Sequence, residues 1–251
     1  MDGAARPDVA HDEPSAAALA AVAVPDGVEL AVAVLDMGSG ACASYGDGWF
    51  ETASVVKVDI LATLLLRAQD EGRWLTAAEE SHATAMIVHS DNTSASALWR
   101  AIGQAEGLDA ANERFGLTGT EGGDGTLWGL TRTTAVDQLR LLLQVFGEDS
   151  ALSGASRAYL RGLMGRVAEG QRWGVSAAAD DACCALKNGW LPRTATGLWV
   201  VNSIGRVTAG GRDCLVAALS KGNRTREAGA RGPASGTPEG RVWRRWVRPP
   251  A

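Results

Sequence analysis

The sequence predicts an α+β protein in which a five-stranded antiparallel sheet, flanked by helices, is combined with an all-helical lobe. Three observations support this. Two β-like runs lie before residue 54, the chain then follows helical spacing to about residue 168, and three more β-like runs come after it. Strands from both ends of a chain can share one sheet when the helical segment connects them. We therefore expect an α/β lobe of residues 15–53 and 176–251, a helical lobe of residues 54–175 and a flexible N-terminus of residues 1–14.

The strands are predicted from apolar runs bounded by turn residues. Residues 28–37 and 41–45 are joined by Gly38-Ser39-Gly40, which is typical of a hairpin. The three later strands are expected at 182–191, 198–207 and 213–220. Ahead of the first strand, the apolar run 16–24 predicts the first helix of the fold.

The helices of the middle segment are predicted from apolar residues three and four positions apart. The first begins near Ser54 and is expected to end near Gly72. Further helices are expected at 77–88, 93–102, 108–115, 133–146 and 153–167. Two Gly-rich stretches, 118–129 and 229–240, predict loops, and residues 242–246 are expected to form a short terminal helix.

Composition and charge argue against several classes of function. The net charge of −5 gives no overall reason to expect nucleic acid as a partner, and the basic residues from Lys221 onward are expected to be a solvated tail. No apolar run reaches the ~18 residues of a membrane span. The first fourteen residues lack the basic start of a secretory signal. We therefore expect a cytoplasmic protein with no membrane partner.

The cysteines and histidines form no pattern that would hold a metal ion. Cys42, Cys183, Cys184 and Cys214 all fall in expected strands, and adjacent cysteines cannot pair without strain. The prediction is reduced thiols that pack as small hydrophobic side chains. The histidines, at positions 11, 82 and 89, have no ligand spacing either. We expect no metal and no cofactor.

Lysine is scarce in this chain, which has three lysines against twenty-one arginines. Two of the three, Lys57 and Lys187, lie in short motifs with polar neighbours. A buried lysine amine can lose its proton, whereas an arginine guanidinium cannot. These two positions are therefore candidates for a base that arginine could not replace.

Three motifs contain these lysines and their polar neighbours. Ser54 lies at an expected helix start, and Lys57 follows one turn later on the same face, within reach of the serine Oγ. The second motif is Ser90-Asp91-Asn92, just before the helix expected at 93–102, and the third is Lys187-Asn188-Gly189 in an expected strand. Taken singly, the motifs also fit a structural interpretation, as helix caps and a hairpin turn.

Together, the motifs Ser-x-x-Lys, Ser-Asp-Asn and Lys-Asn-Gly make the sequence similar to class A β-lactamases and penicillin-binding proteins. The resemblance covers roughly residues 15–223, because the order of strands and helices also matches. It implies an acyl-enzyme on Ser54, with Lys57 as the base that takes the serine proton. Ser90 would relay a proton to the leaving group, and Lys187 would supply positive charge for a substrate carboxylate.

The resemblance also implies the substrate-binding residues. Asn92 would hold an amide of the substrate, and Asn188 and Gly189 would contribute from the third motif. The backbone N–H groups of Ser54 and Trp190 would form the oxyanion hole. The expected partner is a small-molecule or peptide-like substrate, and the oligomeric state is left open.

Several positions depart from the family pattern. Asn188 stands where the family usually has Thr or Ser, and Trp190 is larger than the residue usual beside the oxyanion hole. The segment between Lys57 and Ser90 is also short.

The loop 118–129 is the most important departure. It lacks the Glu-x-x-Leu-Asn pattern whose glutamate, in class A β-lactamases, activates the water that clears the acyl-enzyme. Glu121 and Asp124 are the carboxylates nearby.

Several functions therefore stay open. The chain is expected to be a serine hydrolase or acyltransferase acting on an amide or ester. The alternatives are a non-catalytic ligand-binding protein of the same fold and a true class A β-lactamase that uses Glu121. The complete motif set favours an enzyme, whereas a Ser-His-Asp hydrolase is disfavoured because no Gly-x-Ser-x-Gly sequence exists.

Overall fold

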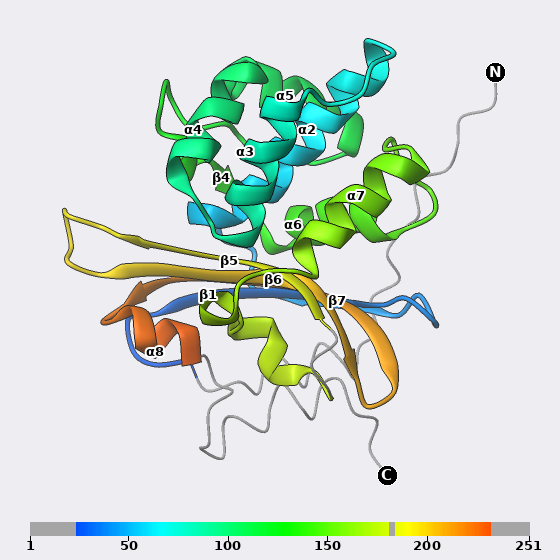
Figure 1. The fold of residues 1–251 in the computed structure, drawn as a ribbon. Helices are drawn as coiled ribbons and strands as arrows, with labels where there is room; N and C mark the ends of the chain where they lie inside the picture. The colour runs from blue at the N-terminus through cyan, green and yellow to red at the C-terminus, as the bar shows by residue number, and fades with distance from the viewer. Residues whose placement is uncertain (1–23, 181–183, 232–251) are drawn as a thin grey trace.

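The computed structural model describes residues 24–180 and 184–231, and its centre is a five-stranded antiparallel sheet (Figure 1). The strands are β1 (Glu29–Asp36), β2 (Cys42–Tyr45), β5 (Cys184–Pro192), β6 (Trp199–Ala209) and β7 (Arg212–Asn223). They lie in the order β2-β1-β7-β6-β5. The predicted α+β fold, with strands from both ends of the chain in one sheet, is confirmed.

The helices between β2 and β5 cover one face of this sheet (Figure 1). They are α2 (Val56–Asp70), α3 (Ala77–Val88), α4 (Asn92–Ala101), α5 (Gln104–Phe115), α6 (Ala135–Phe146) and α7 (Gly154–Met164). Among the described residues there are also short 3-10 helices: η1 (Ala53–Val55) and η2 (Trp128–Leu130) in the helical layer, then η3 (Glu169–Gln171) and η4 (Gly174–Ala178), of which η4 packs on the opposite face of the sheet. The division into lobes at residues 53/54 and 175/176 stays a prediction.

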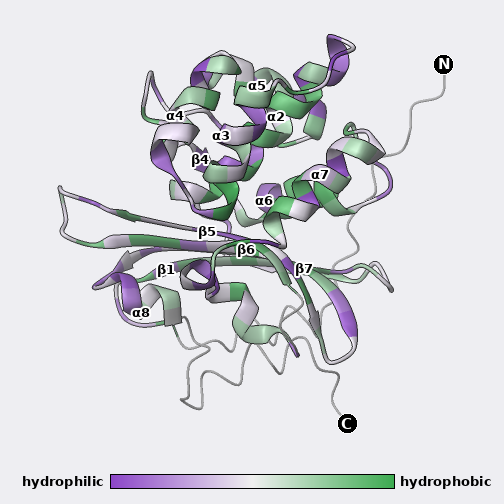
Figure 2. Cartoon of the chain, in the orientation of Figure 1, coloured by the Kyte–Doolittle hydropathy of each residue, from purple (hydrophilic) through white to green (hydrophobic). Residues whose placement is uncertain are grey.

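Helix α2 runs through the centre of the helical layer. Ile60, Leu61 and Leu64 are at most 1% exposed, and Figure 2 shows this helix coloured largely as hydrophobic. A helix that is apolar on most sides is stable only when neighbours surround it, and α3, α4, α5 and α7 all pack against α2. The start of α2, where Ser54 and Lys57 lie, is therefore held in a rigid part of the molecule.

The opposite face of the sheet has its own smaller core. Val32, Leu186 and Val216 point to this side and pack with Val175 of η4. Successive side chains of a strand point to opposite faces, so each strand divides its residues between the two cores. This alternation decides which residues of the third motif can face the helical layer.

Some elements differ from the sequence-based expectation. A two-stranded sheet joins β3 (Phe50–Glu51) to β4 (Arg132–Thr133), and strands of two residues are too short to leave a periodic pattern. Helix α5 starts at Gln104, four residues earlier than expected, because its first turn is polar and gives no apolar signal. Residues 229–231, expected in a loop, end the short helix α8 (Arg226–Arg231).

Other expectations fall outside the described residues. These are the helix at 16–24, except for its last residue, the flexible N-terminus, Cys183, the end of the loop 229–240 and the helix at 242–246. Within residues 24–180 and 184–231, no helix has the length and apolar character needed to cross a membrane.

Candidate active site

Ser54 lies in η1, at the junction between β3 and α2, and its side chain is partly exposed. The chain before it is fixed from two sides. The Thr52 N–H donates to Thr131 O at 2.8 Å, and the Asn202 side chain donates to Glu51 O at 2.8 Å and to Thr52 O at 2.9 Å. Ala53 has φ 49°, in the left-handed region, where a non-glycine residue costs roughly 1–3 kcal/mol. The hydrogen bonds made by Thr52 and Asn202 hold this left-handed backbone in place and so fix the position of Ser54.

Lys57 is fully buried one turn after Ser54. Its Nζ donates to Ser90 O at 2.7 Å, to Ser90 Oγ at 3.1 Å and to Asn92 Oδ1 at 2.8 Å. These three bonds use all the protons of an ammonium group, so the contact with Ser54 Oγ expected from the sequence is not made in this arrangement. Burial lowers the pKa of Lys57 to about 7, and the carboxylate of Asp91 opposes this shift.

Ser90, of the second motif, is in contact with the lysines of both the first and the third motif. It lies between α3 and α4 with φ 57°, another left-handed non-glycine residue. The next residue, Asp91, caps α4 by accepting from the Ser94 N–H at 2.6 Å, so the cap interpretation is confirmed for Asp91. Ser90 itself is turned inward, where its Oγ accepts from both Lys57 and Lys187.

Lys187 comes from β5 and is 1% exposed. Its Nζ donates to Ser90 Oγ at 2.9 Å and to Asn188 O at 2.7 Å. Burial lowers the pKa of Lys187 well below its usual value, and the nearby charge of Lys57 lowers it further. Lys187 therefore adjoins Ser90 and does not present an open charge to a substrate.

Gly189 lets β5 approach Ser54 closely. A Cβ at this position would lie 2.6 Å from Ser54 N and 2.8 Å from Val55 N, closer than atoms can come. Only glycine fits without moving this backbone. The next residue, Trp190, borders the cavity beside Ser54, but its ring lies on the opposite face of the sheet, 5.8 Å from the Trp173 ring and 4.0 Å from the Arg226 guanidinium.

The expected role of Asn188 in substrate binding is wrong for this structure. Lys187 and Gly189 face the helical layer, so the side chain between them points to the opposite face of the sheet. The Asn188 Nδ2 donates to Gln171 O at 2.7 Å and to Trp173 O at 3.0 Å, and the residue is 1% exposed. Asn188 holds the segment before η4 instead.

A cavity of about 570 Å³ opens at Ser54. Asn92, the η2 segment and the end of β5 form its walls, which places Ser54, Asn92 and Trp190 around one space as expected. Trp128 of η2 was not predicted from the sequence; its ring centre lies 4.9 Å from Lys57 Nζ and its Nε1 donates to Ser96 Oγ at 3.1 Å. The signal was a large aromatic in an otherwise Gly-rich loop.

Glu121 and Asp124 do not reach this cavity. The Glu121 carboxylate pairs with Arg132 at 2.5 Å, with both side chains more than half exposed, and its backbone bridges to Arg132. Asp124 is exposed. Among the described residues that line the cavity none is a carboxylate, so nothing there corresponds to the deacylating glutamate.

The remaining candidates for a metal or thiol site are the cysteines, histidines and carboxylates of the described residues. Cys42 and Cys214 are free thiols, all three described cysteines (Cys42, Cys184 and Cys214) are buried, and burial raises the pKa of Cys42 to about 11. Within the described parts of the chain, His, Cys, Asp and Glu side chains form no group of three that could hold a metal ion.

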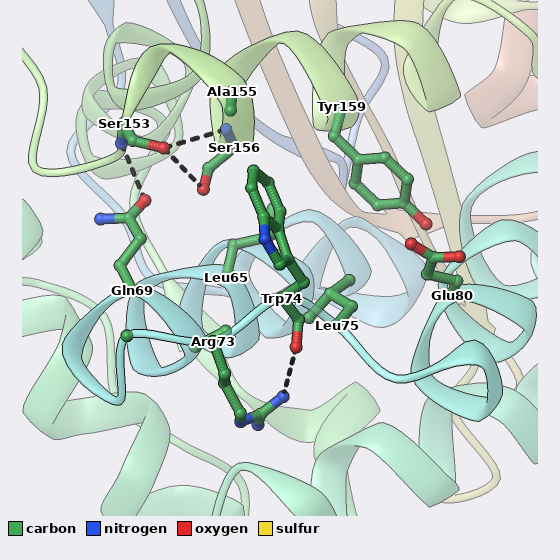
Figure 3. Close-up of a pocket in the computed structure, with 12 residues that line it drawn as sticks. Leu65, Gln69, Arg73, Trp74, Leu75, Glu80, Ser153, Ala155, Ser156 and Tyr159 are labelled. Atoms are coloured by element: carbon green, nitrogen blue, oxygen red, sulfur yellow. Dashed lines mark hydrogen bonds between the residues drawn. The ribbon is translucent and has the colours of Figure 1, made fainter.

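A second cavity, of about 480 Å³, lies between α2, the α2–α3 loop and α7 (Figure 3). Trp74, which is 83% exposed, stands beside it together with Gln69, Ser153 and Tyr159. None of the motif residues lines this space, so it is separate from the Ser54 site.

Comparison with known proteins agrees with this geometry. The profile of the Beta-lactamase enzyme family matches residues 79–235, which include the second and third motifs. The chain is 31% identical over 176 residues to "Putative lipoprotein LppW" of Mycobacterium bovis and of Mycobacterium tuberculosis, covering 66% of this chain. It spans about half the length of these curated relatives, 55%.

Solved structures share the fold over almost the whole chain. PBP-A superposes with a TM-score of 0.76 at 22% identity, covering 93% of this chain and 94% of that one. The TLA-3 extended-spectrum β-lactamase gives 0.77 at 15% identity, with 94% and 99% covered. A β-lactamase from Xanthomonas campestris gives 0.73 at 22%, with 94% and 96% covered. By its profile match and its fold, the chain belongs to the β-lactamase enzyme family.

Proposed function

We propose that this protein is a serine enzyme that takes an acyl group from an ester or amide onto Ser54 and passes it to an amine or alcohol more readily than to water. The observation that supports the acyl-enzyme is the contact of two buried lysines, Lys57 and Lys187, with Ser90, together with the bond from Lys57 to Asn92, which lines the cavity at Ser54. Burying two amines is costly, and a ligand-binding protein would have no need of them.

The acylation step follows from these contacts. Neutral Lys57 has a lone pair, so one of its three hydrogen bonds is released and the amine can take the Ser54 proton. Ser54 Oγ then bonds to the acyl carbon, while the backbone N–H groups of Ser54 and Trp190 stabilise the developing oxyanion. As the bond to the leaving group breaks, Ser90 Oγ passes a proton to that group and regains one from Lys57.

The second half of the reaction determines whether the enzyme is a hydrolase or a transferase. Hydrolysis needs a base that activates water over the acyl ester, and the described residues lining the cavity supply no carboxylate. The η2 side chain that lies beside Lys57 is Trp128, an aromatic ring and not a carboxylate. A neutral amine is a better nucleophile than unactivated water, which supports transfer to an amine acceptor. One solved relative, a point mutant of PBP-A, is named as an acyl-enzyme complex with penicillin G.

The location of the protein is also a proposal. The cytoplasmic location expected from the sequence fits a biosynthetic substrate, whereas the name of the LppW relatives includes the word lipoprotein. Fractionation of cells that express the full-length chain decides between cytosol and envelope.

The lifetime of the acyl-enzyme tests the proposed function. The protein is loaded with a penicillin or an activated ester and followed by intact mass with and without an added amine, at matched pH. The proposal expects slow release in buffer and faster release with amine, and Glu121→Gln, an exposed site, should not change either rate. Fast turnover in plain buffer that is abolished by Glu121→Gln would show a β-lactamase instead. No adduct with any donor would favour a ligand-binding protein.

A further inference from the structure

The walls of the Ser54 cavity are mainly apolar. Leu127 and Trp128 come from one side, and Leu191 and Pro192 from the end of β5 on the other. Leu127 is 53% exposed, so a ligand in the cavity could cover it. A ligand that covers these side chains removes apolar surface from water, which favours binding of an apolar group.

The cavity presents little free charge. Arg193 is the charged side chain among the described lining residues, and its guanidinium lies 3.3 Å from Glu51 Oε1. Lys187 is 1% exposed and already donates to Ser90 and to the Asn188 carbonyl. Asn188 offers no hydroxyl and points to the other face of the sheet. The groups that would hold a substrate carboxylate are therefore buried, paired or turned away.

We infer that the acyl donor is an uncharged ester with an apolar acyl group, an alkyl chain or an aryl ring, and that it carries no carboxylate. This inference rests on the acyl-enzyme proposed above and specifies its substrate. Ser54 Oγ bonds to the acyl carbon, the bond from that carbon to the ester oxygen breaks, and the alcohol leaves with the proton that Ser54 gave up. The acyl chain lies between Leu127 and Leu191.

A series of p-nitrophenyl esters tests the inference. The acylation burst of p-nitrophenolate is measured for acetate, butyrate, hexanoate and octanoate, and for the anionic hemisuccinate, with Ser54→Ala as the blank. Each methylene that becomes fully buried is expected to raise the acylation efficiency by up to about four-fold. The hemisuccinate, equal in length to butyrate, is expected to be at least ~10-fold slower, because its charge has no partner in the cavity.

Variants of the cavity walls test whether the preference for long acyl chains comes from the residues named above. Leu127→Ser should lower the ratio of octanoate to acetate efficiency, and Leu191→Ser is a second variant from the other wall. Trp74→Ser, which removes another exposed apolar side chain far from Ser54, is the matched control and should leave this ratio unchanged.

The results that would overturn the inferred substrate differ from those that would overturn the proposed acyl-enzyme. A fluorophosphonate that labels Ser54, combined with a flat ester series or a preference for hemisuccinate, overturns the inference and leaves the acyl-enzyme standing. A labelled Ser54 that no ester acylates also overturns it. Absence of any label on Ser54 overturns the proposed function itself.

Discussion

Lys57 and Lys187 donate hydrogen bonds to the same atom, Ser90 Oγ, at 3.1 and 2.9 Å. A serine oxygen has two lone pairs, and these bonds occupy both, so its own proton is free to point elsewhere. Two ammonium groups so close together repel each other, which favours one neutral amine. The arrangement therefore provides both a base and an oriented proton donor.

Lys57→Arg tests the base. Arginine keeps the positive charge but cannot give up its proton, so acylation of Ser54 should slow by a factor of ~10²–10⁴. Stopped-flow acylation measures the rate, and circular dichroism checks the fold. Near-normal acylation would mean that Lys57 acts only through its charge or its packing.

The pH dependence of the acylation rate reports the protonation state of Lys57. Its pKa is lowered to about 7, and the neutral form is the base, so the rate should rise with pH through about 7 and then level off. Asp91 raises this pKa, so Asp91→Asn, which keeps a helix-capping side chain, should move the midpoint to lower pH. A rate that falls across this range would indicate that charged Lys57 is the active form.

Gly189→Ala tests the close approach of β5 to the nucleophile. The added Cβ would come within 2.6 Å of Ser54 N, so the η1 backbone must shift and acylation should fall by at least ~10-fold. Gly162→Ala in α7, where nothing lies within 4 Å of the new Cβ, is the control and should keep full activity. Equal activity in the two variants would contradict the geometry.

Asp59 links stability to pH independently of catalysis. It is 1% exposed, burial raises its pKa to about 8, and the side-chain amide of Asn112 lies 3.1 Å from Asp59 Oδ1. Because the folded pKa lies above the unfolded one, the contribution of this group to stability is complete below about pH 4 and is lost as the pH rises toward 8.

The substitution Asp59→Asn should remove this loss of stability at higher pH, because an amide does not ionise. Thermal unfolding should show the variant gaining in Tm over the parent as the pH rises from 4 to 8, whereas exposed Asp70→Asn should show no such trend. A constant difference in Tm would mean that Asp59 is not protonated in the folded protein.

The sequence predicted the five strands and the three motifs because both depend on local pattern. Alternation of apolar residues marks strands, and Ser54 and Lys57 are one helical turn apart. It could not show that Lys57 bonds to Ser90 rather than to Ser54, because that depends on how α4 is capped 33 residues away. It also could not show the face on which Asn188 lies, since a strand's register is set by its partner. Trp128 was missed because its loop has no periodic pattern.

The most direct test of the acyl-enzyme is to map the adduct formed by an activated ester or a fluorophosphonate. The protein is labelled, digested and sequenced by mass spectrometry, in parallel with Ser54→Ala. The account predicts one adduct per chain, on Ser54, and none in the variant. An adduct on Ser90, on a lysine or on a cysteine that persists in Ser54→Ala would contradict it.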